Sequence, residues 1–281
     1  WNFRSLFVNG RRAPRARLPK FSPDAQGAKN VFHVGEIKHP ENTWLFAGNN
    51  TFKPQEGDVQ PWDSLNDAEF VVLHYWVEER LPQPQLNPRT GWLSFARRTA
   101  MALYEAYEDM FGNVELARYY IDNLFEALTE PGEWYLNRET GRLYYLPRPG
   151  ETPANTKIYA PRTQSFVRAS GCFFNDSIDP VDAHATSHVV GLKFEGLIFR
   201  HADWFSPLAE APSHHPTFGE HLPIGGSVQA AHAVPGSVSF RAARDCAITD
   251  CTIEHAGLYG LQFADGCRDC AAIGNHLHDL G

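Results

Sequence analysis

Two runs, each made of three polar residues at matching positions in similar stretches, occur late in the sequence. Their side chains could take part in catalysis. The first run is Arg200, Glu254 and His278. The second run follows one residue later and is His201, His255 and Asp279. Carboxyl and imidazole groups are the usual proton donors and acceptors of hydrolytic sites. The matched spacing predicts that the fold stacks both runs along one edge.

Each run has a structural interpretation beside the functional one. Arg200 and Glu254 could form a solvated ion pair, since strand alternation points both outward. His201, His255 and Asp279 fall where a strand meets a turn, so they could instead cap the local backbone. The functional alternative is that both runs line an external groove, where a long substrate would lie beside a packed interior.

The elements that must position these residues are three similar stretches, 192–201, 246–255 and 270–279. The second and third are 24 residues apart and the first and second are 54 apart. A 24-residue period of short strands without intervening helices predicts a β-solenoid, with the inserted loop at about 204–235. Matched residues of adjacent coils would then lie about 4.8 Å apart.

The same alignment predicts the interior of the coils. Apolar ladders are expected at Phe199, Ile253 and Leu277, at Phe194, Ile248 and Ala272, and at Leu192, Cys246 and Cys270. Asn275 aligns with Cys251 and should bond to turn backbone. The cysteine spacing superficially resembles a zinc ribbon, but the repeat explains these residues as small buried hydrophobes.

The inserted loop could build a wall beside the groove. It opens with Asp203 and Trp204 and carries several histidines that match no strong metal-binding motif. Trp204 and Tyr259 could stack on sugar rings, or they could pack beneath the loop.

The preceding 160 residues read as β-rich with one helical part. Asn9-Gly10 predicts a turn in an opening segment whose six cations could form an anion site or a solvated hairpin edge. Residues 70–76 predict a strand, and residues 133–147 predict an aromatic hairpin. Apolar residues recur every three or four positions over 97–128, which predicts a helix interrupted near Gly112.

Composition excludes several classes of protein. The net charge of −8 argues against nucleic-acid binding, and no apolar run approaches the length of a membrane helix. Five cysteines do not suggest a disulfide framework. The chain starts at Trp1 and stops within the repeat, so we expect an internal fragment of a longer protein that lacks part of its active site.

Several strings together resemble right-handed parallel β-helix proteins of carbohydrate breakdown. They are FRSLFVNGRRAPRARLP, EPGEWYLNRETGRLYYLP, GLIFRHADW, CTIEHAGLYGLQFADGC and GNHLHDLG, in this order along the chain. The chain is most similar to glycoside hydrolase family 141 of the pectate-lyase-like proteins. That resemblance implies a secreted or periplasmic location, fucosidase or xylanase activity, and catalytic aspartates on later coils.

The sequence therefore predicts a mainly β protein. An N-terminal β-rich region with a short helical segment is expected over 1–160, and the first coils of a right-handed parallel β-helix over 161–281. We expect a glycoside hydrolase that acts on plant cell-wall oligo- or polysaccharide through two carboxyl groups and without a cofactor. Asp279 is the predicted catalytic residue. The predicted substrate-binding residues are His201, Asp203, Trp204, Glu254, His255 and Tyr259.

Two other functions remain open at this point. A polysaccharide lyase would require Ca²⁺ held by clustered acids and a Lys or Arg base. A non-catalytic carbohydrate-binding solenoid would use the same outer aromatic residues without a carboxyl pair, since fold alone does not decide function.

Overall fold

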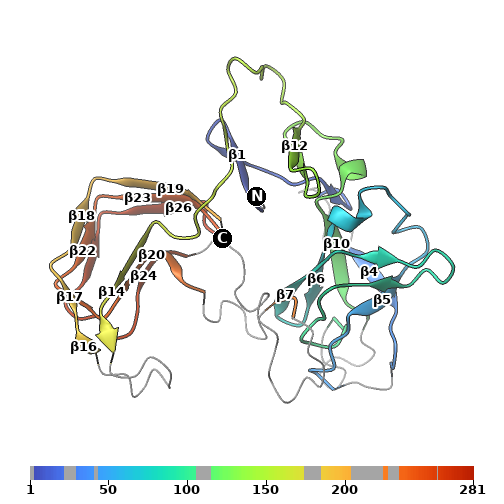
Figure 1. The fold of residues 1–281 in the computed structure, drawn as a ribbon, viewed down its shortest axis with the longest axis horizontal. Helices are drawn as coiled ribbons and strands as arrows, with labels where there is room; N and C mark the ends of the chain where they lie inside the picture. The colour runs from blue at the N-terminus through green and yellow to red at the C-terminus, as the bar shows by residue number, and fades with distance from the viewer. Residues whose placement is uncertain are drawn as a thin grey trace. The chain divides into compact units, whose positions relative to one another are not determined.

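The protein is described here by a computed structural model that covers residues 3–21, 30–40, 44–105, 115–173, 185–203, 224–226, 234–257 and 259–281. Its regular structure is almost entirely β-strand (Figure 1). The chain divides into two compact units. Unit 1 comprises Trp1–Asn2, Ala13–Asn155 and Ser206–His232, and unit 2 comprises Phe3–Arg12, Thr156–Phe205 and Ala233–Gly281.

Unit 1 is built on a curled antiparallel sheet with the strand order β7-β6-β10-β4-β5-β9-β8, and β3 also pairs with β10. Its strands are β3 (Arg17–Leu18), β4 (Phe32–Glu36), β5 (Thr51–Pro54), β6 (Glu69–His74), β7 (Val77–Pro82), β8 (Gln85–Leu86), β9 (Leu93–Ser94) and β10 (Arg118–Asp122). Two single 3-10 turns accompany them, η2 (Leu65–Asp67) and η3 (Phe125–Ala127).

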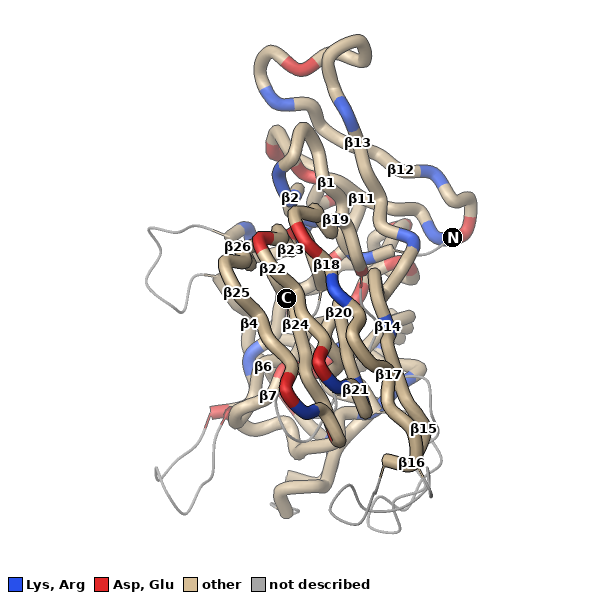
Figure 2. The backbone as a smooth tube through the Cα atoms, turned by 90° about the vertical axis from the view of Figure 1, so that its left-hand side faces the viewer, with Lys and Arg blue, Asp and Glu red and all other residues tan. Residues whose placement is uncertain are grey.

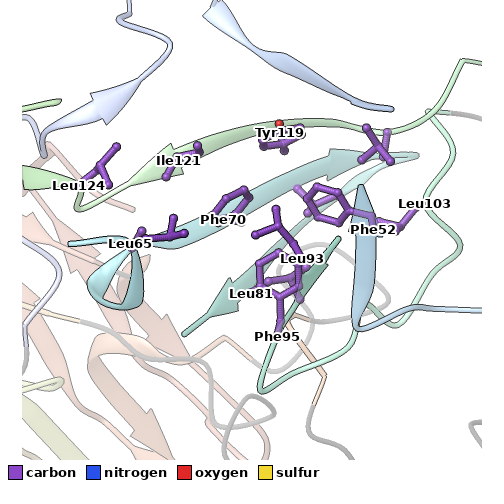
Figure 3. Packing of buried hydrophobic residues seen from close by; sticks show 14 of the residues in the cluster. Phe52, Leu65, Phe70, Leu81, Leu93, Phe95, Leu103, Tyr119, Ile121 and Leu124 are labelled. Carbon is purple, nitrogen blue, oxygen red and sulfur yellow. The ribbon is translucent and has the colours of Figure 1, made fainter. Parts of the chain in front are cut away.

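The core of unit 1 is rich in aromatic rings. Figure 3 shows Phe52, Phe70, Phe95 and Tyr119 packed against one another, and all four side chains are buried. The Phe70 and Tyr119 rings stack with centroids 5.5 Å apart. Strand alternation sends every second residue of β10 into this core, which is what one buried face of a sheet requires.

The expected helix over 97–128 is wrong in the described residues. Residues 118–122 form strand β10, which pairs antiparallel with β6 from Arg118↔Leu73 to Asp122↔Glu69. Ala117, Tyr119 and Ile121 are all fully buried, so burial repeats every two residues, as in a strand. The helical spacing arises because Leu124, which lies beyond the strand, also turns into the core. Residues 106–114 lie outside the described residues.

The predicted hairpins are confirmed. Strands β11 (Trp134–Asn137) and β12 (Arg142–Tyr145) pair antiparallel through an Asn137–Gly141 loop. In unit 2, β1 (Leu6–Val8) and β2 (Arg11–Ala13) flank Asn9 and Gly10, whose φ angles of 50° and 75° suit a tight hairpin turn. Strand β13 (Ile158–Tyr159) pairs antiparallel with β1.

Arg15 and Lys20, two cations of the opening segment, belong neither to an anion site nor to a solvated hairpin edge. The Arg15 guanidinium lies 3.2 Å from Glu69 and 3.1 Å from Asp122, and all three side chains are nearly buried. Lys20 pairs with the buried Glu133 at 2.5 Å. These cations balance acids within unit 1, because a buried carboxylate requires a partner.

Unit 2 carries parallel strands stacked in register (Figures 1 and 2). Three sheets have the orders β14-β20-β24, β18-β22-β25 and β19-β23-β26, and β17 pairs parallel with β21. The strands are β14 (Val167–Ser170), β17 (Val189–Val190), β18 (Lys193–Glu195), β19 (Ile198–Ala202), β20 (Gly236–Arg241), β21 (Ala243–Arg244), β22 (Ala247–Thr249), β23 (Thr252–Ala256), β24 (Tyr259–Phe263), β25 (Ala271–Ile273) and β26 (His276–His278). The short strands β15 (Cys172–Phe173) and β16 (Ala185–Ser187) pair antiparallel.

The parallel registers are those that the 24- and 54-residue spacings predict. Two observed ladders are Phe199, Ile253 and Leu277, and Phe194, Ile248 and Ala272. The Ala247 N–H donates to Leu192 at 3.0 Å and the Ala271 N–H donates to Cys246 at 2.9 Å, which continues the third ladder. Cys246 and Cys251 are buried among apolar side chains.

Asn275 bonds to backbone as predicted. Its Oδ1 accepts from the Cys251 N–H at 2.9 Å, and its Nδ2 donates to the Ile248 carbonyl at 2.8 Å. One coil away, the sulfur of Cys251 takes the equivalent place and accepts from the Leu197 N–H at 3.4 Å. The amide therefore joins two adjacent coils at a position where the backbone leaves the sheet.

The whole described chain is a mainly β protein with more antiparallel than parallel pairing, and is not a solenoid throughout. The division expected near residue 160 falls between Asn155 and Thr156, and Phe3–Arg12 joins the later part of the chain. Most of the predicted loop 204–235 lies outside the described residues. No helix in the described chain is long and apolar enough to cross a membrane.

Candidate functional site

Three matched residues of unit 2 form a corner at the ends of β19, β23 and β26: His201 and His255 are the penultimate residues of their strands, and Asp279 directly follows β26. His201, His255 and Asp279 have φ angles of 69°, 55° and 47°. A positive φ is uncommon outside glycine, so its repetition at matched positions marks a bend that each coil requires. The bend was expected at the end of these strands, and it brings the three residues together.

The two histidines form the centre of an aromatic stack. The His201 and His255 rings lie 4.8 Å apart at 24°, and their Nδ1 atoms are 3.2 Å apart. Tyr159 stacks on His201 at 4.8 Å and 12°, and Phe7 stacks on His255 at 4.5 Å and 18°. The opening hairpin and β13 thus pack on this corner.

This environment disfavours the charged form of both imidazoles. Burial, reinforced by His255 and Arg200, lowers the pKa of His201 to about 4. Burial is also the main cause that lowers the pKa of His255, although Glu254 and Asp279 oppose the shift. Two neutral rings can share one hydrogen between their Nδ1 atoms, whereas two imidazolium rings would present donors to each other. The surroundings of His201 and His255 therefore favour the neutral form of both imidazoles.

Asp279 is held by two neighbours. Its Oδ1 accepts from Arg12 Nε at 2.9 Å, and its Oδ2 lies 3.7 Å from His255 Nε2. Within the described part of the chain, no backbone N–H donates to this carboxylate, which differs from a turn cap. The side chain is 32% exposed. A partly exposed carboxylate with fixed neighbours can act on a bound molecule.

Arg12 is the residue of this corner that the sequence interpretation missed. Besides Asp279 Oδ1, its guanidinium donates to the carbonyls of Ala256 and Asp279 at 3.1 Å each, and to Ser5 Oγ at 3.1 Å. It also lies 4.9 Å from the centre of the Phe7 ring. The only signal in the sequence was the basic opening segment.

Arg200, Glu254 and His278 form a polar ladder beside this corner, because they are register partners on three parallel strands. Glu254 lies between Arg200, whose Nε is 3.3 Å away, and His278, whose Nε2 is 3.0 Å away. The expected ion pair between Arg200 and Glu254 is confirmed. Glu254 is 15% exposed, because its neighbours on both adjacent strands cover it.

The remaining predicted site residues fall in different surroundings. Asp203 is only 3% exposed, and its Oδ2 accepts from the Arg4 N–H at 2.6 Å, so it anchors the opening hairpin. This buried position does not fit the predicted contact with substrate. Tyr259 is 44% exposed at the start of β24, opposite Gly236. Trp204 lies outside the described residues.

The corner combines carboxyl groups with imidazoles at hydrogen-bonding distances. In the described ranges, no group of three His, Cys, Asp or Glu side chains is placed to hold a metal ion. Asp279 directly follows His278, which is the register partner of Glu254 on the adjacent parallel strand. The arrangement can supply two carboxyl groups to a molecule that lies along the edge.

Comparison with known proteins adds a similarity of fold. No protein-family model matches the chain, and no curated protein matches its sequence. A solved structure titled "Glycoside hydrolase" is similar, with a TM-score of 0.57 and 18% sequence identity. The similarity covers 92% of this chain and 44% of that chain, so this chain spans less than half the length of that structure. The chain therefore has a glycoside hydrolase-like fold.

Proposed function

We propose that this chain belongs to a secreted glycoside hydrolase whose right-handed parallel β-helix, as in family 141, presents an outer edge to plant cell-wall polysaccharide. The observation that carries the proposal is that Asp279 and Glu254 come from neighbouring strands and each lies beside a histidine, with His255 3.7 Å from Asp279 and His278 3.0 Å from Glu254. The glycoside hydrolase-like fold supports it.

Hydrolysis of a glycosidic bond requires two carboxyl groups with different tasks. One carboxylic acid protonates the leaving oxygen, while a carboxylate either attacks the anomeric carbon or activates a water molecule. We assign the carboxylate role to Asp279, because the Arg12 guanidinium fixes its Oδ1 and leaves the side chain partly exposed. Glu254 is ion-paired with Arg200 and would contact the substrate as a carboxylate, so an acid of a further coil would supply the proton.

The remaining groups would orient the sugar. His255 lies 3.7 Å from Asp279 Oδ2 and would hold that oxygen in place. Tyr259 offers an exposed aromatic face of the kind on which sugar rings stack. We also propose specificity for fucosides or xylans, because the sequence resembles glycoside hydrolase family 141.

The test is turnover by the full-length enzyme on fucosylated and xylan-type cell-wall oligosaccharides. Asp279→Asn should lower kcat at least about 100-fold, because it removes a required carboxyl group, whereas Glu254→Gln should chiefly raise KM, because it removes a substrate contact. The matched control is Asp269→Asn, which alters an exposed acid elsewhere on the coils and should keep normal turnover.

Three other results would overturn the proposal. Normal turnover by Asp279→Asn would remove the assigned role of that residue. Release of unsaturated products would identify a polysaccharide lyase. Saccharide binding without any cleavage would identify a binding solenoid.

A further inference from the structure

A cleft in unit 1 lies apart from the residues assigned above and has the features of a binding site. Its volume is about 510 Å³. It is formed where β5, β8 and β9 meet the loop that joins β8 to β9. Its lining includes Lys38, Thr51, Gln85, Arg89, Trp92 and Ser94. A concave site that combines an aromatic ring with a few polar groups is the usual form of a small-ligand pocket.

Two cations in this cleft lack a carboxylate partner. Lys38 and Arg89 are both exposed, and among the described residues neither forms an ion pair. The Lys38 ammonium lies 5.5 Å from the centre of the Trp92 ring. Other exposed cations of the described chain, such as Arg11 and Arg142, also form no ion pair, but Lys38 and Arg89 line the same cleft.

A second hairpin of the same unit shows that the turn itself does not require these side chains. The β8–β9 loop reads Asn87-Pro-Arg-Thr-Gly-Trp92, and the β11–β12 loop reads Asn137-Arg-Glu-Thr-Gly-Arg142. In both loops the Asn Oδ1 accepts from the Thr N–H, at 3.3 and 2.7 Å, and the Gly N–H donates to the Asn carbonyl, at 2.8 and 2.9 Å.

The two loops make the same turn but carry different side chains at matched positions. Where the first has Arg89 and Trp92, the second has Glu139 and Arg142. Since Asn, Thr and Gly make the same turn in both, the cation and the aromatic ring are not needed to form it. Their presence over a cleft therefore calls for another explanation, and ligand binding provides one.

From this geometry we infer that the cleft binds a sugar residue that bears a carboxylate, such as a uronic acid of an acidic polysaccharide. Arg89 and Lys38 would pair with the sugar carboxylate, for which a guanidinium offers paired donors. The half-buried Trp92 ring would pack against the sugar, and Thr51, Gln85 and Ser94 would face its hydroxyl groups. The inference extends the proposed action on cell-wall polysaccharide, but it does not depend on hydrolysis.

The test is calorimetric titration of the full chain with a short oligogalacturonide. We expect saturable binding that weakens as salt increases, because the ion pairs are exposed to solvent. The methyl-esterified oligosaccharide, which lacks the charges, should bind at least about tenfold more weakly. Arg89→Ala and Trp92→Ala should each cause a similar loss, and Trp92→Phe should restore part of the affinity.

The matching hairpin supplies the controls. Glu139→Ala and Arg142→Ala change the equivalent positions of that loop and should leave binding unchanged. An equal loss in these variants, or equal binding of the acid and its ester, would overturn the inference. Competition by sulfate as effective as by the oligosaccharide would also overturn it, because it would identify a general anion site.

A parallel assay separates this inference from the proposed function. Asp279→Asn should still bind the oligogalacturonide, and Arg89→Ala should still cleave a short neutral substrate. Binding without cleavage would contradict only the proposed hydrolysis, whereas cleavage without binding would contradict only the site in unit 1.

Discussion

The Nδ1 atoms of His201 and His255 lie 3.2 Å apart, and their stacked rings are covered by Tyr159 and Phe7. Such a pair tolerates one shared hydrogen but not two positive charges. The corner of the coils should therefore be sensitive to pH.

The first prediction concerns this sensitivity. The pKa of His201 is about 4 in the folded protein, against about 6.5 for an unperturbed histidine. Between these values the unfolded chain binds more protons, so the free energy of unfolding should be constant above about pH 6.5 and fall as the pH drops toward 4. His201→Phe keeps an aromatic ring and should reduce this slope in chemical denaturation at several pH values.

An NMR titration offers a direct check of the same prediction. The His201 ring signals should titrate near pH 4 in the wild-type protein. A midpoint near 6.5, or an unchanged slope in His201→Phe, would contradict the neutral pair.

The second prediction concerns Arg12, which donates to two carbonyls as well as to Asp279 and Ser5. Arg12→Ala should lower the free energy of unfolding by about 1–3 kcal/mol, since these bonds are charge-assisted but about one-third exposed. Denaturant unfolding followed by fluorescence would measure the loss.

Its control is the neighbouring exposed Arg11. Arg11→Ala removes the same side chain one position earlier and should change stability by less than about 0.5 kcal/mol. Equal effects of the two substitutions would contradict the anchoring role of Arg12.

The third prediction concerns Asn275, whose amide bonds to the Cys251 N–H and the Ile248 carbonyl. Asn275→Ala removes both bonds and takes the amide acceptor from the Cys251 N–H, which should cost about 1–2 kcal/mol in the free energy of unfolding. Asn155 makes two comparable bonds within an exposed turn, so Asn155→Ala should cost less because water can replace them. Hydrogen exchange at the Cys251 amide should quicken in Asn275→Ala only.

The fourth prediction concerns a fully buried hydrogen-bonded pair of unit 1, His74 and Glu79. Glu79 lies 2.9 Å from His74 Nε2 and accepts from the Ala100 and Met101 N–H groups at 2.6 and 3.2 Å. Glu79→Gln disrupts this set and should destabilise the protein by about 3–5 kcal/mol, as loss of one buried partner generally does. A lower melting temperature of Glu79→Gln in thermal unfolding would reveal this destabilisation.

Glu78, the adjacent residue, serves as the control for Glu79. Its side chain is 46% exposed and pairs with Arg80 at 2.6 Å. Glu78→Gln should therefore cost at most about 1 kcal/mol. A smaller effect for Glu79→Gln than for Glu78→Gln would contradict the structural importance of the buried pair.

The sequence predicted best where its signal was local or repeated. The spacing of Phe199, Ile253 and Leu277 predicted their register, because parallel stacking places equivalent residues on each other. The Asn9-Gly10 turn was predictable because few residues adopt positive φ without strain. The ion pair of Glu254 with Arg200 also followed from the repeat.

The sequence predicted poorly where burial depends on distant partners. Ala117, Ile121 and Leu124 have helical spacing, yet β6 recruits their segment into a sheet. Asp203 seemed to open a substrate-facing loop, but the Arg4 backbone binds its carboxylate. Arg12 was missed because nothing in its own segment indicates a partner 267 residues away.

That separation has a consequence for how unit 2 folds. The hairpin at Phe3–Arg12 packs on a corner whose last residue, Asp279, is 267 positions later in the chain. Closing so long a loop carries a large entropic cost, and contacts of this kind slow folding. During synthesis the hairpin emerges long before its partners exist. Its docking should be the last step in forming unit 2, after the coils have stacked on one another.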